Sequence, residues 1–351
     1  MKNKSLSPTL SKKKGEKTQC HFNNNRINSI VYCLLSISLF SCQPPAEQQS
    51  EEKKIVVIKI NAPDFNPDSA YVYVKTQVDF GPRIPGSKAH EKCADFMSQK
   101  LKSLGWEVIV QKATATTFDT KKYAMKNIIG SYNTQSGKRI LLCAHWDTRP
   151  FADRDSVDTD KPINGANDGA SGVGVLLEVA RMITTLKPKI GVDIILFDLE
   201  DYGQPHESKF PEQEDTWCLG TQYWAKNLHK PGYFAEYAIL LDMVGAKNAT
   251  FPMEGTSMYY APSVVEKVWN VAAKIGYSNY FIPDKTGETT DDHLYVNALA
   301  HIPCIDIVNY NPITRDYPPF HHRHSDNLDL VDKQTLKAVG QTLLELVYSE
   351  N

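Results

Sequence analysis

The chain has 351 residues, of which 23% are charged and 41% hydrophobic, with 19 Gly and 20 Pro. This ordinary globular composition excludes a disordered chain, a collagen-like chain and a multi-span membrane protein. The length permits either two domains or one large α/β domain.

The first 41 residues differ from the rest in charge and hydropathy. They carry seven Lys and Arg against one acid, Glu16, and they contain an apolar stretch, Ile27–Phe40, that is short for a membrane span. A basic leader before a short apolar stretch predicts a signal peptide over residues 1–41. Cys42 follows a small residue, which resembles the signal of bacterial lipoproteins. We therefore expect a lipid on Cys42 and a location in a bacterial cell envelope, facing the periplasm or the exterior. A simple cleaved signal or an uncleaved anchor is the alternative.

Removing residues 1–41 changes the charge of the chain. Lys and Arg fall from 39 to 32, and Asp and Glu fall from 41 to 40, so the net charge becomes −8. Nothing basic remains to favour nucleic acid. The composition predicts a polar tether over residues 42–61. We expect a single α/β domain over residues 62–351, and we expect it to be a monomer. Four cysteines match no zinc knuckle or disulfide framework and are expected as buried free thiols: Cys93, Cys143, Cys218 and Cys304.

Helical and strand patterns alternate beyond residue 61. The strand pattern at 192–198 is continuously apolar, as in strands buried on both faces of a parallel sheet. The alternation predicts an α/β protein with a largely parallel sheet covered on both faces, and ligands bind beyond the carboxyl ends of such strands. In chain order we expect helices 68–78 and 87–104, strands 106–111, 127–132 and 139–144, helix 169–184, strand 192–198, helix 219–228, strand 237–244, helix 263–274, strand 303–308 and helix 332–348.

Acids and histidines follow the predicted strands. His145 ends one strand, Glu200 and Asp201 follow another, and Asp242 ends a third. Asp168 lies in an Asn-Asp-Gly-Ala-Ser-Gly turn before a helix. Carboxylates that converge on one rim repel one another unless a cation is present. Mixed Asp and His ligands without a thiolate suit zinc.

Each of these residues also has an ordinary structural explanation. Asp168 and Asp292 could be helix N-caps, and His145 could be a hydrogen-bonded core histidine. Glu200 and Asp201 could be solvated loop acids. These explanations weaken together, because several independent strand ends carry the same chemistry.

The order of these motifs resembles the co-catalytic zinc aminopeptidases. Four segments are similar to a sister branch, the glutaminyl-peptide cyclotransferases, particularly bacterial ones. The resemblance covers about residues 62–350. The four segments are Phe80–Ser87, His145–Pro150, Leu241–Gly245 and Asp291–His293.

The resemblance implies a three-layer α/β/α sandwich around a central, mostly parallel mixed sheet. It also implies conversion of the N-terminal Gln of peptides or proteins to pyroglutamate, with release of ammonia, and one zinc ion. By position it implies zinc ligands at Asp168, Asp201 and His322, catalytic residues at Glu200, Asp242 and Asp292, and residues at the substrate pocket at Trp217, His145 and Phe320.

Two positions depart from the animal cyclases. Asp201 stands where they have Glu, so backbone or metal must shift to keep a zinc–oxygen distance of about 2.0–2.2 Å. His321 stands where they have Trp, and Phe320 precedes it. The choice of His322 over His324 rests on aligning the Asp-Asn pair that begins at Asp326.

Cyclisation needs a group that takes a proton from the α-amine and gives one to the leaving nitrogen, and Glu200 can do both in turn. A zinc ion would polarise the γ-carbonyl. The alternative is a two-zinc aminopeptidase that uses His145 and Asp242 for the second ion. A third hypothesis is a non-catalytic binding module that keeps the fold.

Overall fold

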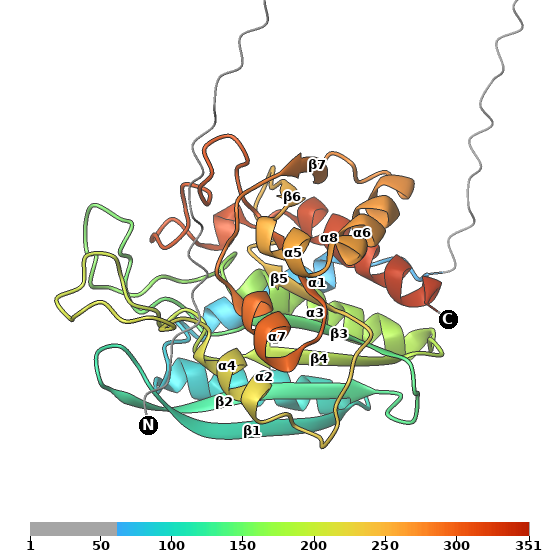
Figure 1. Ribbon diagram of the computed structural model, residues 1–351, viewed down its shortest axis with the longest axis horizontal. Helices are drawn as coiled ribbons and strands as arrows, with labels where there is room; N and C mark the ends of the chain where they lie inside the picture. Colours follow the sequence, from blue (N-terminus) through green and yellow to red (C-terminus); the bar gives the residue numbers. More distant parts are fainter. Residues whose placement is uncertain (1–61, 351) are drawn as a thin grey trace, which may run out of the picture. The chain divides into compact units, whose positions relative to one another are not determined.

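A six-stranded mixed sheet organises residues 62–350, the part of the chain that the computed structural model describes (Figure 1). The strand order is β1-β2-β4-β3-β5-β8, with β4, β3, β5 and β8 parallel and β2 antiparallel to both of its neighbours, β1 and β4. The predicted signal peptide, Cys42 and the tether lie outside the described residues. The strands are β1 (Glu107–Thr116), β2 (Lys122–Tyr132), β3 (Arg139–His145), β4 (Gly191–Phe197), β5 (Ala238–Asp242) and β8 (Cys304–Val308).

Alternating side chains of the parallel strands enter two separate cores, because successive residues of a strand point to opposite faces. On β3, Leu142 and Ala144 belong to the larger core, whereas Leu141 and Cys143 belong to the smaller one. α4 and α7 cover the smaller core, and the other long helices cover the larger one (Figure 1). The helices are α1 (Pro67–Asp79), α2 (Lys88–Ser103), α3 (Ala170–Thr185), α4 (Leu219–Lys226), α6 (Pro262–Lys274), α7 (Asp292–Ala300) and α8 (Lys333–Ser349).

Helices on both faces of a mostly parallel mixed sheet confirm the predicted three-layer α/β architecture. The four cysteines among the described residues are buried and free, as expected. No helix within residues 62–350 is long and apolar enough to cross a membrane.

Several short elements were not predicted, because their residues show no clear helical or strand pattern. β6 (Phe251–Met253) and β7 (Phe281–Lys285) form a separate parallel pair, and α5 (Gly255–Tyr260) follows β6 directly. α7 was also missed, although the shorter α4 was predicted. β1 and β2 are longer than predicted. Only the five residues 128–132 of β2 pair with β4, and the β1–β2 hairpin continues beyond them.

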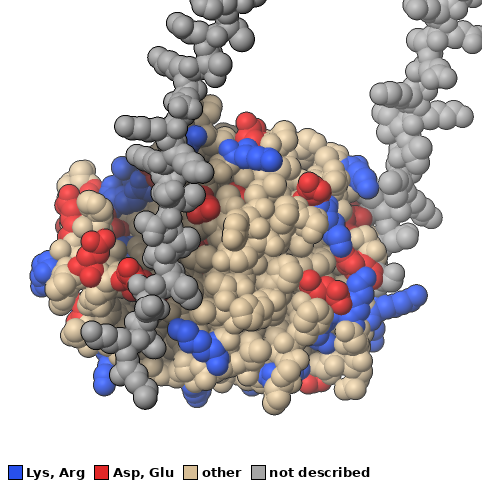
Figure 2. All heavy atoms as spheres, viewed as in Figure 1, with Lys and Arg blue, Asp and Glu red and all other residues tan. Residues whose placement is uncertain are grey.

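Charged side chains are interspersed along the edges of the face shown in Figure 2, and uncharged residues occupy its centre over α5 and α7. This face therefore has no continuous basic patch of the kind that binds nucleic acid.

Candidate active site

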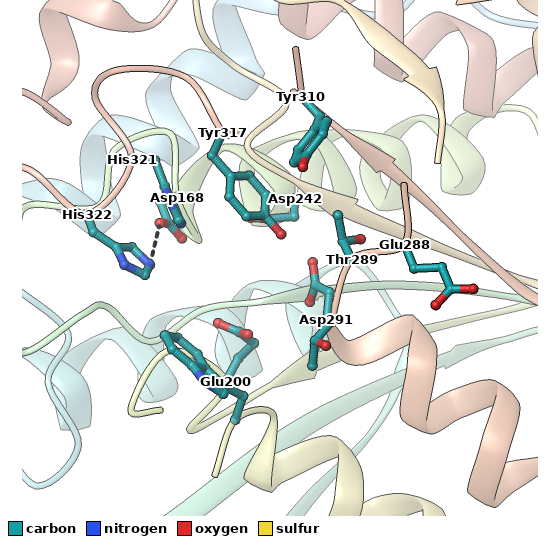
Figure 3. A pocket seen from close by; sticks show the side chains of 12 residues that line it. Asp168, Glu200, Asp242, Glu288, Thr289, Asp291, Tyr310, Tyr317, His321 and His322 are labelled. Atoms are coloured by element: carbon teal, nitrogen blue, oxygen red, sulfur yellow. Dashed lines mark ion pairs between the residues drawn. The ribbon is translucent and has the colours of Figure 1, made fainter. Parts of the chain in front are cut away.

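A cavity of about 320 Å³ lies at the edge of the sheet where β3, β4 and β5 end (Figure 3). Carboxylates, two histidines and aromatic rings line it. Parallel strands bring their carboxyl ends to one edge, which explains why residues far apart in the sequence meet here. Of the predicted site residues, the cavity wall contains Asp168, Glu200, Trp217, Asp242 and His322.

Asp168 does not cap α3, so the simple structural explanation for it is wrong. Gly169 occupies the N-cap position at φ +87°, without a side-chain capping bond. A Cβ at Gly169 would also lie 2.8 Å from the Asp147 carbonyl oxygen, so the turn needs glycine. The carboxylate of Asp326 accepts the backbone N–H groups of Asn167 and Asp168 at 2.8 and 3.0 Å. These bonds leave the Asp168 side chain free to point into the site.

Glu200 and Asp201 follow β4 and are buried rather than solvated. Glu200 is 9% exposed and Asp201 is 1% exposed. Asp147 holds them in place, because its two carboxylate oxygens accept the backbone N–H groups of Glu200 and Asp201 at 3.1 and 3.2 Å. The turn between β4 and Glu200 passes through Leu199 at φ 55°. The solvated-loop explanation for this acidic pair is therefore wrong.

His322 faces both Asp201 and Asp168. Its Nε2 atom lies 3.2 Å from Asp201 Oδ1 and 3.9 Å from Asp168 Oδ2. Two ligands of a tetrahedral zinc ion are separated by about 3.3–3.6 Å, so the spacing of His322 from each carboxylate is close to that of two ligands of one ion. Neither oxygen of the buried Asp201 has a hydrogen bond, which leaves both free for a cation.

The hydrogen-bond partners of the three neighbouring histidines leave different nitrogen atoms free. His322 Nδ1 lies 3.4 Å from Asp153 Oδ1, an arrangement that places the proton on Nδ1 and the lone pair on Nε2. His321 also lies close to Asp168 and His322, but its Nδ1 accepts from Arg154 at 2.8 Å, so its proton belongs on Nε2 and neither nitrogen is free. His324 pairs with Asp155 at 2.7 Å and does not line the cavity.

His145 and Asp242 form a second set of donors with Asp168. His145 Nε2 lies 3.1 Å from Asp168 Oδ1 and 3.2 Å from Asp242 Oδ1, and the three residues are close enough to share a cation. His145 is buried behind these carboxylates and does not line the cavity. It therefore contacts Asp168 and Asp242 on the side away from the cavity. The prediction that His145 lies at the substrate pocket is corrected accordingly.

The structure places Asp291, rather than the predicted Asp292, at the cavity (Figure 3). Asp291 is the N-cap of α7 and its side chain lies in the wall. Asp292 is fully buried behind it and accepts a hydrogen bond from Thr221 Oγ1 at 2.5 Å. The N-cap is therefore Asp291 and not Asp292. Because Asp292 does not line the cavity, it can act on the site only through neighbouring side chains.

Trp217 lies in the cavity wall as predicted, and two neighbours fix its ring. It stacks on His322 at a centroid distance of 5.8 Å and an angle of 11°, and the Arg149 guanidinium lies 4.4 Å from its ring centroid. Phe320 does not line the cavity and packs instead against the larger core. The prediction that Phe320 forms the pocket wall is therefore corrected, with His321 and Tyr317 in that place.

Burial dominates the acid–base properties of the site. It raises the pKa of Glu200 well above its usual range, and the charges of nearby aspartates add to this effect. Burial likewise raises the pKa of Asp242 to about 6 and that of Asp291 to about 7. A carboxyl group that can hold a proton near neutral pH suits general acid–base chemistry.

Several residues around the cavity were not predicted. Tyr310 follows β8, so the strand-end rule could have found it, whereas nothing in the sequence marks Tyr317. Arg149 is fully buried and donates to the backbone carbonyls of Asp201 and Gly203 at 3.0 and 2.9 Å. It lies within one of the quoted motifs, but only the fold reveals what it contacts.

Comparisons with known proteins give two kinds of relative. The profile described as "Peptidase family M28" matches residues 127–347. The Bacteroides thetaiotaomicron glutaminyl cyclase bound to N-acetylhistamine is 50% identical, with a TM-score of 0.81, over 83% of this chain and 100% of that chain. A Zn-dependent exopeptidase from Parabacteroides distasonis is 50% identical, with a TM-score of 0.80, over 82% of this chain and 99% of that chain.

A more distant relative belongs to the peptidases. Aminopeptidase YwaD of Bacillus subtilis is 26% identical over 236 residues, which is 64% of this chain and 44% of that protein. The chain thus spans less than half of the length of this relative. Peptidases and cyclases therefore both resemble it, and the Parabacteroides exopeptidase is matched over nearly as much of its length as the Bacteroides cyclase.

Proposed function

Because the chain belongs to peptidase family M28, and because glutaminyl cyclases match it at 50% identity over their full length, we propose that it is a glutaminyl-peptide cyclotransferase. This acyltransferase converts the N-terminal Gln of peptides or proteins to pyroglutamate and releases ammonia. The proposal rests on the similarity to the cyclase together with the cavity, where Glu200 lies beside the donors Asp168, Asp201 and His322.

Those three donors fit one zinc ion by charge and spacing. A zinc ion bound there would act as a Lewis acid on the γ-carbonyl oxygen of the substrate. Asp201 supplies two oxygens without other partners, and Asp153 holds the His322 ring in the ligating tautomer. The shorter Asp201, in place of the Glu of the animal enzymes, still comes within 3.2 Å of His322.

Glu200 performs the proton transfers in this proposal. Its carboxylate takes a proton as the α-nitrogen attacks the γ-carbon, and it returns that proton to the amide nitrogen as the carbon–nitrogen bond breaks and ammonia leaves. Burial lets it hold the proton between the two steps. Asp291 and Asp242 share the wall with Glu200 and can accept hydrogen bonds from substrate nitrogens (Figure 3).

The aromatic residues make the intramolecular reaction favourable. Trp217, Tyr310 and Tyr317 line the cavity, confine the folded-back Gln side chain and exclude the water that would hydrolyse the amide. The result is cyclisation in place of deamidation.

Two peptides test the proposed reaction, one with N-terminal Gln and one with N-terminal Leu. Mass spectrometry should show the loss of one ammonia from the Gln peptide, with the Leu peptide intact. Removal of the whole first residue from either peptide would replace the cyclase with an aminopeptidase.

The role of Glu200 is tested by Glu200→Gln, which keeps the shape but cannot take a proton. Turnover should fall about 10²–10⁴-fold, the usual contribution of a positioned general base, while zinc content stays unchanged. Unchanged turnover would remove Glu200 from the mechanism and would revive the non-catalytic binding module.

A two-zinc aminopeptidase is the second candidate, because His145, Asp168 and Asp242 form another group of donors. His145 Nε2 lies 3.1 Å from Asp168 and 3.2 Å from Asp242, a spacing that fits either a hydrogen bond or a shared ion. His145→Gln distinguishes the two: a cyclase keeps its zinc stoichiometry, whereas a two-zinc enzyme loses one equivalent.

We also propose that a lipid on Cys42 anchors the enzyme to a bacterial envelope membrane. The support is the basic leader and the apolar stretch before Cys42 in the sequence. The full chain expressed in a bacterium should partition into the detergent phase, and Cys42→Ala should move it to the aqueous phase. A wild-type protein in the aqueous phase would refute the anchor.

A further inference from the structure

A further cluster of metal-ligating side chains lies behind the cavity. It consists of Asp291 at the start of α7, His293 in its first turn and Asp306 on β8. All three are buried, and one donor atom from each lies within 4.8 Å of the others. The cluster contains none of the residues assigned above to the zinc ion.

Two members of this cluster have polar atoms without partners. Asp306 is 1% exposed and neither of its carboxylate oxygens has a hydrogen bond, and His293 Nδ1 also has none. Within residues 62–350 the only carboxylate within 4.0 Å of a His293 nitrogen belongs to Glu254. His293 therefore forms no direct ion pair with Asp306 that would neutralise its charge. Burial raises the pKa of Asp306 well above its usual range, which expresses the cost of an uncompensated charge there.

Glu254 determines which nitrogen of His293 is available. Its carboxylate lies 3.0 Å from His293 Nε2 and accepts backbone N–H groups from Thr256, Ser257 and Thr289 at 2.7–2.8 Å. These donors hold Glu254 as a carboxylate, so the His293 proton resides on Nε2 and the lone pair on Nδ1. Histidines that bind a metal through one nitrogen usually donate the N–H of the other nitrogen to a carboxylate in this way.

We propose that Asp291, His293 and Asp306 bind a divalent cation of the Zn²⁺ class, separate from the zinc of the proposed mechanism. One imidazole nitrogen and two carboxylates suit such an ion, and its charge would compensate both acids. Asp291 lines the cavity, which supplies an entry route. Occupancy would withdraw the Asp291 carboxylate from the cavity and slow the reaction.

Elemental analysis tests the site in a background that lacks Asp168. Asp168→Asn removes a residue common to the two donor groups described at the cavity. After dialysis against Zn²⁺, the Asp168→Asn protein should retain about one equivalent of zinc, and the Asp168→Asn/Asp306→Asn protein should retain none. An empty Asp168→Asn protein, or equal zinc in both, would overturn the site. Because the measurement is of binding, it stands apart from any failure of the cyclase assignment.

Single variants provide the controls. Asp306→Asn should lose one equivalent relative to the wild type, and the exposed Asp329→Asn should lose none. Circular dichroism establishes that Asp306→Asn is folded, and His293→Gln gives the same comparison if it is not. Co²⁺ offers a second readout, since its visible absorption in Asp168→Asn should vanish on adding Asp306→Asn. Persistent absorption would overturn the assignment.

Discussion

His322 and His324 stand two residues apart and each has an aspartate partner, yet only one faces the cavity. Asp153 lies against Nδ1 of His322, and Asp155 lies against Nδ1 of His324. The pairing with Asp153 orients Nε2 of His322 toward Asp168 and Asp201. Because both histidines have the same kind of partner, the position of the ring at the cavity, and not the partner alone, distinguishes His322 from His324.

Removing the carboxylate behind His322 should weaken zinc binding. Asp153→Asn is expected to lower zinc affinity about 10–100-fold, the usual effect of losing such a partner, as measured by competition with a chelating dye. Asp155→Asn is the matched control and should leave the affinity unchanged. Equal losses in both variants would return His324 to the list of ligands.

Trp217 depends on a glycine beside it. A Cβ added at Gly203 would lie 1.9 Å from the Trp217 ring, so Gly203→Ala must displace that ring from the wall. We expect kcat/KM for a Gln peptide to fall about tenfold, equivalent to ~1.4 kcal/mol, mostly through KM. Gly137→Ala, where a Cβ meets nothing within 4 Å, is the control. An unchanged KM in Gly203→Ala would show that Trp217 does not contact substrate.

Glu254 joins three elements through one carboxylate. It caps α5 through Thr256 and Ser257, accepts the N–H of Thr289 before α7, and contacts His293 within α7. Burial opposes its charge, but the hydrogen bond to His293 and the electrostatic attraction of that residue, followed by the backbone N–H groups of Ser257 and Thr256, prevail and lower its pKa from 4.5 to about 2. At the element scale this side chain sets the position of α7, and therefore of Asp291 in the cavity wall.

The lowered pKa of Glu254 predicts a pH dependence of stability. A carboxyl whose folded-state pKa lies below its unfolded value stabilises the fold above pH 4.5, and that stabilisation is lost as the pH falls toward 2. Its size is on the order of 3 kcal/mol. Glu254→Gln should flatten the acid limb of the unfolding free energy, measured by urea denaturation with a chelator present. The exposed Glu266→Gln should follow the wild type, and an unaltered limb in Glu254→Gln would contradict the prediction.

At the scale of the whole molecule, the donors of the proposed zinc ion join distant parts of the chain. Asp168 precedes α3, Asp201 follows β4, and His322 lies in the loop before α8. An ion that binds all three only when the chain is folded stabilises the folded state by about 4 kcal/mol at 1,000 times its Kd.

Chelation should therefore lower the melting temperature. We expect EDTA to reduce the Tm by on the order of 10 °C in calorimetry, and added Zn²⁺ to restore it. Asp201→Asn should show a smaller shift, since it lacks one ligand. A Tm that is indifferent to EDTA would mean that the three donors hold no ion in the folded protein.

The sequence by itself determined the central sheet, the long helices over the larger core, α4 over the smaller core and the edge where the site lies. Continuous apolar strands and the acids that follow them are local features, so they are legible without a structure. The motifs at Asp168, Glu200 and Asp242 likewise indicated which side chains meet, because parallel strands share one carboxyl edge.

Only the tertiary structure decided between neighbours. Asp291 rather than Asp292 enters the cavity because the direction of each side chain depends on how α7 begins against the sheet. His321, His322 and His324 are distinguished by their partners and by the position of each ring at the cavity, and those partners are contributed by another loop. Such choices rest on long-range packing and hydrogen bonding, which no local pattern of residues encodes.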